Sequence, residues 1–261
     1  MTLSSVISTS KADGIYYYES GAYPRLPVVS YDRQGSSVTR FSRSELPPDV
    51  YESANIFHTS GITLALSRSL CDNVIAMMEE FHNAGALISF DVNYRAALWS
   101  EDEARATVGS ILPLVDILFI SEETSRRMLG MTGSLEEIQR TLSERYPNLK
   151  IIASTMRRVI SVQRHSFTSR IYDTELGESF TEAEYKNIDV VDRIGSGDAY
   201  VAGALYGLLR FGDIESAARY GNAMAALKNT VPGDMSECDL ADIEMIIRNH
   251  TSGEPRSEMV R

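Results

Sequence analysis

The sequence predicts an α/β protein in which a doubly wound, mainly parallel sheet is flanked by helices and preceded by a small β-lid. From Pro47 onward, short apolar segments typical of strands alternate with longer segments whose apolar residues recur at helical spacing. Before that point, three strand-like segments follow one another with no helix between them. Such alternation is typical of a parallel sheet covered on both faces, and a separate layer of short strands often acts as a lid.

The composition fits a globular α/β protein and excludes several classes of partner. The chain has 261 residues, 43% of them hydrophobic, and its net charge of −11 argues against a nucleic-acid or anionic-membrane partner. No apolar stretch approaches the roughly 18 residues that a membrane span needs, and the first residues lack a secretory pattern. The two cysteines, Cys71 and Cys238, have no metal-binding spacing. Two isolated thiols fit a reducing compartment, so we predict a cytoplasmic protein.

Three segments are predicted along the chain. Residues 1–13 are small and polar and are expected to form a flexible tail, residues 14–45 form the β-lid, and residues 46–261 form the α/β core. Within the lid, β-branched and aromatic residues favour strands. These strands are predicted at residues 15–18, 27–31 and 37–41.

The core elements are predicted from the periodicity of their apolar residues. Between residues 67 and 84, the apolar residues from Leu70 to Phe81 recur at helical spacing, and Gly85 suits the end of that helix. Residues 115–120 are almost continuously apolar, as expected of a strand covered on both faces. Strands are predicted at 54–58, 87–91, 115–120 and 149–153, a hairpin at 158–174, and a last strand that ends at Val190 and Val191. Helices are predicted at 67–84, 101–111, 122–130, 134–146, 197–210, 213–229 and 239–249.

Polar or glycine-containing segments directly follow the predicted core strands. In a sheet wound by right-handed crossovers, the carboxyl ends of the parallel strands meet at one edge, so we expect a single active-site crevice there. The segments are 59–63, 91–95, 121–124, 154–158 and 193–198.

The segment 190–203 combines the end of a strand, a glycine-rich turn and the start of a helix. Such a turn brings backbone N–H groups toward an anion, and Gly195, Ser196 and Gly197 are placed to do so. The carboxylate of Asp198 would repel a bound phosphate, but it could accept the proton of a hydroxyl group that attacks a phosphoryl group. The alternative is an ordinary acidic residue in the first turn of a helix, and the spacing alone leaves both interpretations open.

The segment 192–198 resembles the second signature of the ribokinase-like (PfkB) carbohydrate kinases, Asp-Thr-x-Gly-Ala-Gly-Asp. Other segments occur in the same order as in one branch of that family, the 2-keto-3-deoxygluconate kinases. These segments are Ser60–Ser67, Ser89–Arg95 with Leu98 and Trp99, and the lid element Tyr31-Asp32-Arg33. The resemblance covers about residues 14–250 and implies a ribokinase-like fold.

This resemblance implies roles in binding and phosphorylating a sugar acid. Asp198 would be the general base that deprotonates the terminal hydroxyl group of the sugar, and the backbone of residues 195–197 would form the anion hole. Arg33 and Arg95 would bind the carboxylate or the hydroxyl groups of the sugar, because a guanidinium group forms bidentate hydrogen bonds with a carboxylate. The alternative for Arg95 is a structural role. Further substrate contacts would come from Tyr17, Tyr31 and Asp234.

The resemblance also implies that ATP and Mg²⁺ bind. Glu122 and Glu123 occupy the place of the family's magnesium-linked motif and would act on the metal through water. The nucleotide contacts are expected from Ser121, Thr155, Arg157, Gly195, Gly197 and Asn222. For two of these residues an alternative interpretation remains: Arg157 is a surface cation, and Asn222 serves close helix packing.

The predicted function is the ATP-dependent phosphorylation of a 2-keto-3-deoxy sugar acid, 2-keto-3-deoxygluconate, to its 6-phosphate. Two other hypotheses remain: a kinase for a neutral sugar such as fructose or ribose, and a non-catalytic nucleotide-binding homologue. The family's opening strand and Gly-Gly sugar-binding turn have no counterpart before Ile15, so we expect a chain that lacks the family's N-terminal segment. The family also implies a homodimer formed through the β-lid, whose strand edges would be exposed.

Overall fold

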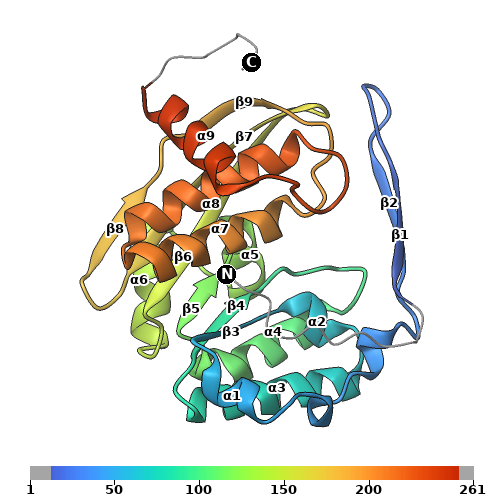
Figure 1. Ribbon diagram of the computed structural model, residues 1–261, viewed down its shortest axis with the longest axis vertical. Coiled ribbons are helices and arrows are strands. Elements are labelled where there is room, and N and C mark those ends of the chain that lie inside the picture. Colours follow the sequence, from blue (N-terminus) through green and yellow to red (C-terminus); the bar gives the residue numbers. More distant parts are fainter. Residues whose placement is uncertain (1–12, 253–261) are drawn as a thin grey trace. The chain divides into compact units, whose positions relative to one another are not determined.

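A computed structural model describes residues 13–252 (Figure 1). These residues divide into two compact units, which consist of residues 13–19 with 28–114 and of residues 20–27 with 115–252. The predicted tail lies outside the described residues, apart from its last residue. Among the described helices, none combines the length and the apolar character that crossing a membrane requires.

The first unit begins with an antiparallel hairpin of β1 (Ile15–Glu19) and β2 (Val28–Asp32). The third strand predicted for the lid, at residues 37–41, is wrong, because the chain forms the 3-10 helix η1 (Ser37–Arg40) there. Local hydrogen bonds replace strand pairing: the backbone carbonyl of Ser36 accepts from the backbone N–H of Thr39 at 3.1 Å and from its hydroxyl group at 2.7 Å. Hydroxyl side chains compete with extended structure in this way.

The rest of the first unit is an α/β arrangement around two parallel strands. Strands β3 and β4 pair in parallel from Ile56 opposite Leu87 to Ser60 opposite Asp91. Helix α3 buries an apolar stripe from Leu70 to Phe81, as its helical spacing predicted. The elements after the hairpin and η1 are η2 (Arg43–Glu45), α1 (Asp49–Ser53), β3 (Ile56–Ser60), α2 (Gly61–Ala65), α3 (Arg68–Asn83), β4 (Leu87–Asp91), α4 (Glu101–Ile111) and η3 (Leu112–Leu114).

The second unit contains a mixed sheet. Strands β5 and β6 are parallel, whereas β7 runs antiparallel to β6 and also pairs with β8 and β9. The α/β class is confirmed, and the predicted hairpin at 158–174 corresponds to the turn between β6 and β7. The strands are β5 (Ile117–Phe119), β6 (Ile151–Ser161), β7 (Arg164–Asp173), β8 (Glu178–Thr181) and β9 (Tyr185–Asp189). The helices are α5 (Glu122–Leu129), α6 (Leu135–Arg145), α7 (Ser196–Phe211), α8 (Ile214–Asn229) and α9 (Leu240–Ser252).

Helices α7 and α8 pack closely against each other. A side chain at Gly203 would meet the backbone of Tyr220 at 2.5 Å, and one at Gly207 would meet that of Ala217 at 2.6 Å. Helix α8 buries a row of alanines and contacts β7, β8 and β9, as Figure 1 shows for the orange helices of this unit. The small residues of α8 therefore serve helix packing, which was one of the two interpretations of that segment.

Candidate active site

The segment between β9 and α7 is held by a buried carboxylate. Asp192 is only 5% exposed, and its carboxylate accepts hydrogen bonds from the backbone N–H groups of Ile194 at 2.9 Å and Gly233 at 3.1 Å. Val190 and Val191 lie after β9 rather than at its end, because the N–H groups of Val191 and Asp192 both donate to the carbonyl of Asn229. The turn before α7 is thus tied to the segment that follows α8.

Gly195 forms the start of α7 in a conformation that other residues rarely adopt. Its φ is 77°, in the left-handed region, and a Cβ atom there would collide with the backbone oxygen of Asp234. No side chain caps this helix, and Gly197 has open space around it. Because the first N–H groups of a helix lack partners within the helix, this N-terminus can hold an anion. The geometry therefore fits the predicted anion hole.

Asp198 lies exposed in the first turn of α7, beside this N-terminus. The helix is anchored two residues later by Tyr200, which is 1% exposed. The Tyr200 ring packs edge-on against Phe119 of β5 at 6.0 Å and against Phe167 of β7 at 5.6 Å between centroids. The buried tyrosine sets the start of α7 next to the carboxyl end of β5, while the carboxylate of Asp198 stays open to a ligand.

Ser121 follows β5, and Thr155 lies within β6, which continues to Ser161 instead of ending at Ala153 as predicted. Phe119 pairs with Ala153, and the N–H of Ile120 donates to the carbonyl of Ala153 at 3.0 Å. Neighbouring strands lie about 4.8 Å apart, so the residues that follow this pair are neighbours. Ser121 also caps α5, since its hydroxyl group accepts from the N–H of Thr124 at 3.1 Å. These two predicted nucleotide contacts are therefore close together.

The acidic residues that follow Ser121 do not form a metal site by themselves. An oxygen of Glu122 accepts a hydrogen bond from Arg126 at 2.7 Å, and Glu123 is exposed. Across residues 13–252, no cluster of three or more His, Cys, Asp or Glu side chains could hold a metal ion. Mg²⁺ commonly takes one or two carboxylates, with phosphate oxygens and water as its other ligands. The donors present fit such a partial site but not a complete one.

Two arginines flank a buried histidine near the turn before α7. His165 on β7 is 3% exposed, and its pKa is lowered by burial and further by the positive charges of Arg157 and Arg193. Both arginines are exposed. Arg193 was not predicted as a site residue, because an isolated arginine in a turn carries no signal of its own.

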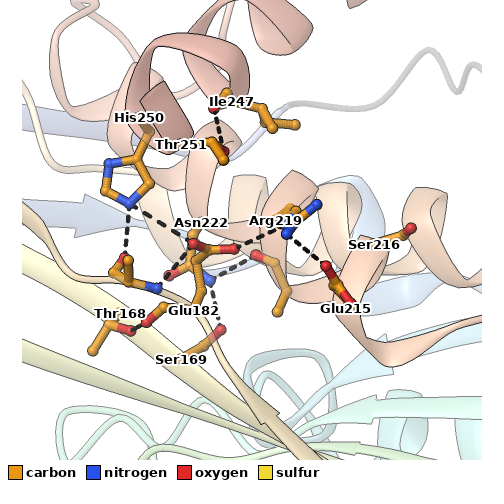
Figure 2. A network of polar contacts seen from close by, with 12 residues as sticks. Thr168, Ser169, Glu182, Glu215, Ser216, Arg219, Asn222, Ile247, His250 and Thr251 are labelled. Atoms are coloured by element: carbon orange, nitrogen blue, oxygen red, sulfur yellow. Dashed lines mark hydrogen bonds and ion pairs between the residues drawn. The ribbon is translucent and has the colours of Figure 1, made fainter. Parts of the chain in front are cut away.

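Asn222 lies inside the protein rather than on an open surface. It is 0% exposed, and its amide nitrogen donates to the hydroxyl group of Ser169 and to the carbonyl of Ala218, each at 2.6 Å. Figure 2 shows Asn222 among polar contacts that join α8 to the sheet, next to Glu182 and Arg219. These contacts support the packing interpretation, and a contact with the nucleotide stays a prediction.

The buried side chain of Lys228, which was not predicted as a site residue, contacts the turn before α7. Lys228 is 0% exposed, and its ammonium group donates to the carbonyls of Asp192 at 3.2 Å and Val231 at 3.0 Å. Burial lowers the pKa of Lys228, while the negative charges of Asp192 and Asp234 oppose that shift. The signal available in the sequence was a single lysine that follows the apolar run 223–227 of α8.

In the first unit, the hairpin groups Tyr31 and Arg33 on one face. The guanidinium carbon of Arg33 lies 3.9 Å from the centre of the Tyr31 ring, and the ring of Tyr16 lies 6.1 Å from that of Tyr31. Tyr17 pairs with Ser30 and therefore points to the opposite face, since side chains alternate along a strand. The predicted pair of Tyr17 and Tyr31 is thus separated, and Tyr16 takes its place beside Tyr31.

The polar segments after β3 and β4 lie together, as predicted for a shared sheet edge. Ser60 is opposite Asp91, and a side chain at Gly61 would collide with the carbonyl of Val92. The turn after β4 is formed by Asn93 with a φ of 34°, and its N–H donates to the carboxylate of Asp91 at 3.2 Å. Arg95 follows, exposed, with one hydrogen bond to the carbonyl of Tyr94.

Comparison with known proteins decides the family. The model of the pfkB family of carbohydrate kinases matches residues 6–240. The chain belongs to this family. Its members are phosphotransferases that act on a sugar hydroxyl group, and the turn of residues 192–198 lies within the match. The predicted resemblance is therefore confirmed.

Relatives of this PfkB protein include two kinases with similar names. A 2-dehydro-3-deoxygalactonokinase of Haloferax volcanii is 35% identical over 240 residues, which cover 92% of this chain and 72% of the relative. A 2-dehydro-3-deoxygluconokinase of Bacillus subtilis is 30% identical over 211 residues, which cover 80% of this chain and 61% of the relative. The chain thus matches between three fifths and three quarters of the length of these two proteins.

Solved structures agree with the ribokinase-like fold. The 2-dehydro-3-deoxygluconokinase of Thermotoga maritima has a TM-score of 0.84 at 29% identity and covers 90% of this chain and 72% of its own. A PfkB family carbohydrate kinase of Listeria grayi has a TM-score of 0.83 at 31% identity, with coverages of 91% and 73%. The predicted fold class is confirmed at the level of the family.

Proposed function

We propose that this PfkB protein is an ATP- and Mg²⁺-dependent kinase that phosphorylates a 2-keto-3-deoxy sugar acid, such as 2-keto-3-deoxygluconate, at its terminal hydroxyl group. The observation that carries the proposal is the exposed carboxylate of Asp198 at the uncapped N-terminus of α7. A carboxylate at a site suited to phosphate makes chemical sense when it acts on the group that attacks the phosphate. The names of the two curated relatives support the substrate class.

In the proposed reaction, Asp198 accepts the proton of the sugar hydroxyl group. The hydroxyl oxygen forms a bond to the γ-phosphorus of ATP, and the bond from that phosphorus to the bridging oxygen breaks and releases ADP. The N–H groups at the start of α7 stabilise the negative charge on the transferring phosphoryl group. Gly195 permits this approach because it has no side chain. Mg²⁺, held by phosphate oxygens with help from Glu122 or Glu123, would neutralise phosphate charge.

The remaining predicted residues divide between the two substrates. We assign Tyr31 and Arg33 to the sugar acid because they share one face of the hairpin, and we add Tyr16, whose ring lies on that face. Arg95 and Asp234 are assigned to the sugar as well, since both are exposed at the ends of their segments. We assign Ser121 and Thr155 to the nucleotide because the register of β5 and β6 brings them together, and we add Arg157, which lies exposed on β6 two residues after Thr155.

The proposal is tested by replacing the base. Asp198→Asn keeps the size and removes the charge, and we expect kcat to fall by at least about 10³-fold while the melting temperature changes little. Asp213→Asn is the matched control, because Asp213 caps α8 and asparagine caps helices equally well. Activity is measured as ADP formation with 2-keto-3-deoxygluconate and 2-keto-3-deoxygalactonate. Full activity of Asp198→Asn would remove Asp198 from the mechanism.

The two arginines distinguish a sugar acid from a neutral sugar. If a carboxylate is bound, Arg33→Ala and Arg95→Ala should each raise KM for the sugar acid by roughly tenfold or more and leave KM for ATP unchanged. Turnover of fructose or ribose that is insensitive to both changes would favour the neutral-sugar kinase. A thermal shift with ATP, in the absence of phosphoryl transfer to any of these sugars, would favour a non-catalytic nucleotide-binding protein.

A further inference from the structure

Lys228 occupies an unusual place for a lysine at the end of a helix. Lysines near a helix C-terminus commonly reach the last carbonyls from solvent. The side chain of Lys228 is instead fully buried, and one of its two carbonyl partners, that of Asp192, is 36 residues away along the chain. Burying an ammonium group costs desolvation free energy, which its hydrogen bonds must offset. The role of Lys228 therefore lies in the contacts that it makes.

Those contacts join two segments that border the anion hole. The turn that leads to Gly195 begins at Asp192, and the segment that leads to Asp234 begins at Val231. Lys228 donates to the backbone carbonyls of both residues. The same segments meet again where the Asp192 carboxylate accepts from Gly233 at 3.1 Å, and where Gly195 touches the backbone of Asp234. Of the groups that make these contacts, the ammonium group of Lys228 is the one that donates hydrogen bonds to both segments.

We propose that Lys228 is a positioning residue of the anion hole, because its ammonium group holds the carbonyls of Asp192 and Val231 together and so fixes the turn from Gly195 to Asp198 against the Asp234 segment. Lys228 touches no substrate in this role. Its effect falls on the geometry of the N–H groups and of the Asp198 carboxylate, which matter most in the transition state. The kinetic part of this inference rests on the proposed function.

Three variants of the full chain test the role. Lys228→Met keeps an unbranched side chain and removes both donated hydrogen bonds. Lys228→Gln removes the charge but keeps two N–H donors of similar reach. Thr230→Val is the matched control, since the exposed Thr230 hydroxyl group donates only to the carbonyl of Leu227 in the same helix end. Melting temperature, kcat and both KM values are measured for each variant.

We expect Lys228→Met to lower kcat by at least about tenfold, with much smaller changes in KM, because the lost positioning acts in the transition state. Lys228→Gln should recover most of that loss, and Thr230→Val should match the wild type. The proposal is overturned if a folded Lys228→Met keeps its kcat, or if Lys228→Gln folds but is as impaired as Lys228→Met. It is also overturned if neither variant folds, because Lys228 is then a requirement of folding.

Amide hydrogen exchange separates this inference from the proposed function. In Lys228→Met, exchange at residues 192–198 and 230–234 should accelerate by at least about tenfold, while exchange in α3 stays unchanged. This measurement needs no substrate. Faster exchange in a protein that phosphorylates no sugar acid would leave the positioning role standing and overturn the proposed function. Unchanged exchange in Lys228→Met, together with an active wild-type enzyme, would overturn the positioning role and leave the proposed function standing.

Discussion

At the scale of single residues, Gly195 carries the strictest backbone requirement of the candidate site. Its left-handed φ of 77° would cost a residue with a side chain about 1–2 kcal/mol, and the side chain would also meet the backbone of Asp234. The two effects differ in consequence. The strained φ lowers stability alone, whereas the collision with the backbone of Asp234 displaces the segments that border the proposed anion hole.

We expect Gly195→Ala to lower the free energy of unfolding by more than about 2 kcal/mol and to lower kcat. Gly212→Ala is a close control, because Gly212 has the same φ of 77° at the end of α7 and nothing lies within 4 Å of its Cβ position. Urea unfolding and steady-state kinetics are measured for both variants. Equal loss of stability in the two, with normal kcat in Gly195→Ala, would contradict the close approach to Asp234.

His165 predicts how stability depends on pH. Its Nδ1 atom is buried with no hydrogen-bond partner among the described residues, and burial together with Arg157 and Arg193 lowers its pKa below the usual 6.5. The folded protein thus binds fewer protons at this site than the unfolded chain does. The stability contributed by neutral His165 is present above pH 6.5 and is lost as the pH falls through the lowered pKa.

We expect wild-type stability to fall between pH 7.5 and 5.5 more steeply than that of His165→Leu, with the difference in slope at most about 1.4 kcal/mol per pH unit. Urea midpoints at several pH values measure both proteins. The other titrating groups are common to the two proteins and cancel in the comparison. Parallel curves would show that His165 takes up a proton in the folded state as readily as in the unfolded chain.

At the scale of elements, a buried carboxylate ties α8 and α9 to the end of β8 (Figure 2). Glu182 is 8% exposed, and its carboxylate lies 3.7 Å from Arg219 of α8 and 3.8 Å from His250 of α9. His250 also stacks on Tyr185 at 3.6 Å between ring centres. A buried charge that loses a partner is costly, so these contacts couple the three elements.

Arg219→Ala should therefore lower the free energy of unfolding by about 1–2 kcal/mol, since Arg219 is itself partly exposed. In the double variant with Glu182→Gln the cost should be smaller than the sum of the two single costs. Arg248→Ala is the control, because Arg248 pairs with Glu244 on the solvent side of α9 and exposed pairs contribute less than about 1 kcal/mol. Additive costs in the double variant would show that Arg219 and Glu182 do not interact.

Helices α3 to α9 were predicted to within a few residues because their signals are local, whereas the five-residue helices α1 and α2 were not predicted. Residues 101–111 were predicted as a helix and form α4 with those bounds, after a capping box between Ser100 and Glu103. The same local logic misassigned residues 37–41, where β-branched residues favoured a strand but Ser36 and Thr39 bond within their own turn. The last predicted strand corresponds to β9, which ends at Asp189 before the two valines, whereas the four-residue strand β8 was not predicted because only Phe180 in it is apolar.

At the scale of the whole molecule, one face of the hairpin exposes three apolar side chains beside the polar Glu19, Ser30 and Asp32. Ile15, Tyr17 and Val28 are 53%, 67% and 58% exposed, and the register of β1 and β2 places them on the same face. An exposed apolar face on a two-stranded sheet is a surface that another chain can cover. We therefore propose that two copies of the chain pair through this face, opposite the face of Tyr31 and Arg33.

This pairing predicts the mass of the protein in solution. Sedimentation velocity should show a species of twice the chain mass for the wild type and a single chain for Val28→Lys, because a charge in the contact is costly to bury. Lys186→Glu, an exposed change on β9, is expected to leave the mass unchanged. A wild-type protein that sediments as one chain at all concentrations would rule out the hairpin as a dimer contact.

The sequence by itself determined the fold class, the family and the central turn. Residues 192–198 are contiguous, so their order alone specifies a glycine-rich turn, a helix start and an acidic residue next to it. A motif of this kind is readable because neighbours along the chain remain neighbours in space. Tyr31 and Arg33 were named from one contiguous segment for the same reason, and their role in binding a sugar stays a prediction.

Only the tertiary structure decided how that turn is supported and which side chains share a face. Lys228 meets Asp192 across 36 residues, and the Asp192 carboxylate meets Gly233 across 41. Asn222 is buried because β7 supplies Ser169, and Tyr16 rather than Tyr17 joins Tyr31 because of the strand register. Such partners depend on packing and register between distant segments, and no local pattern of residues encodes them.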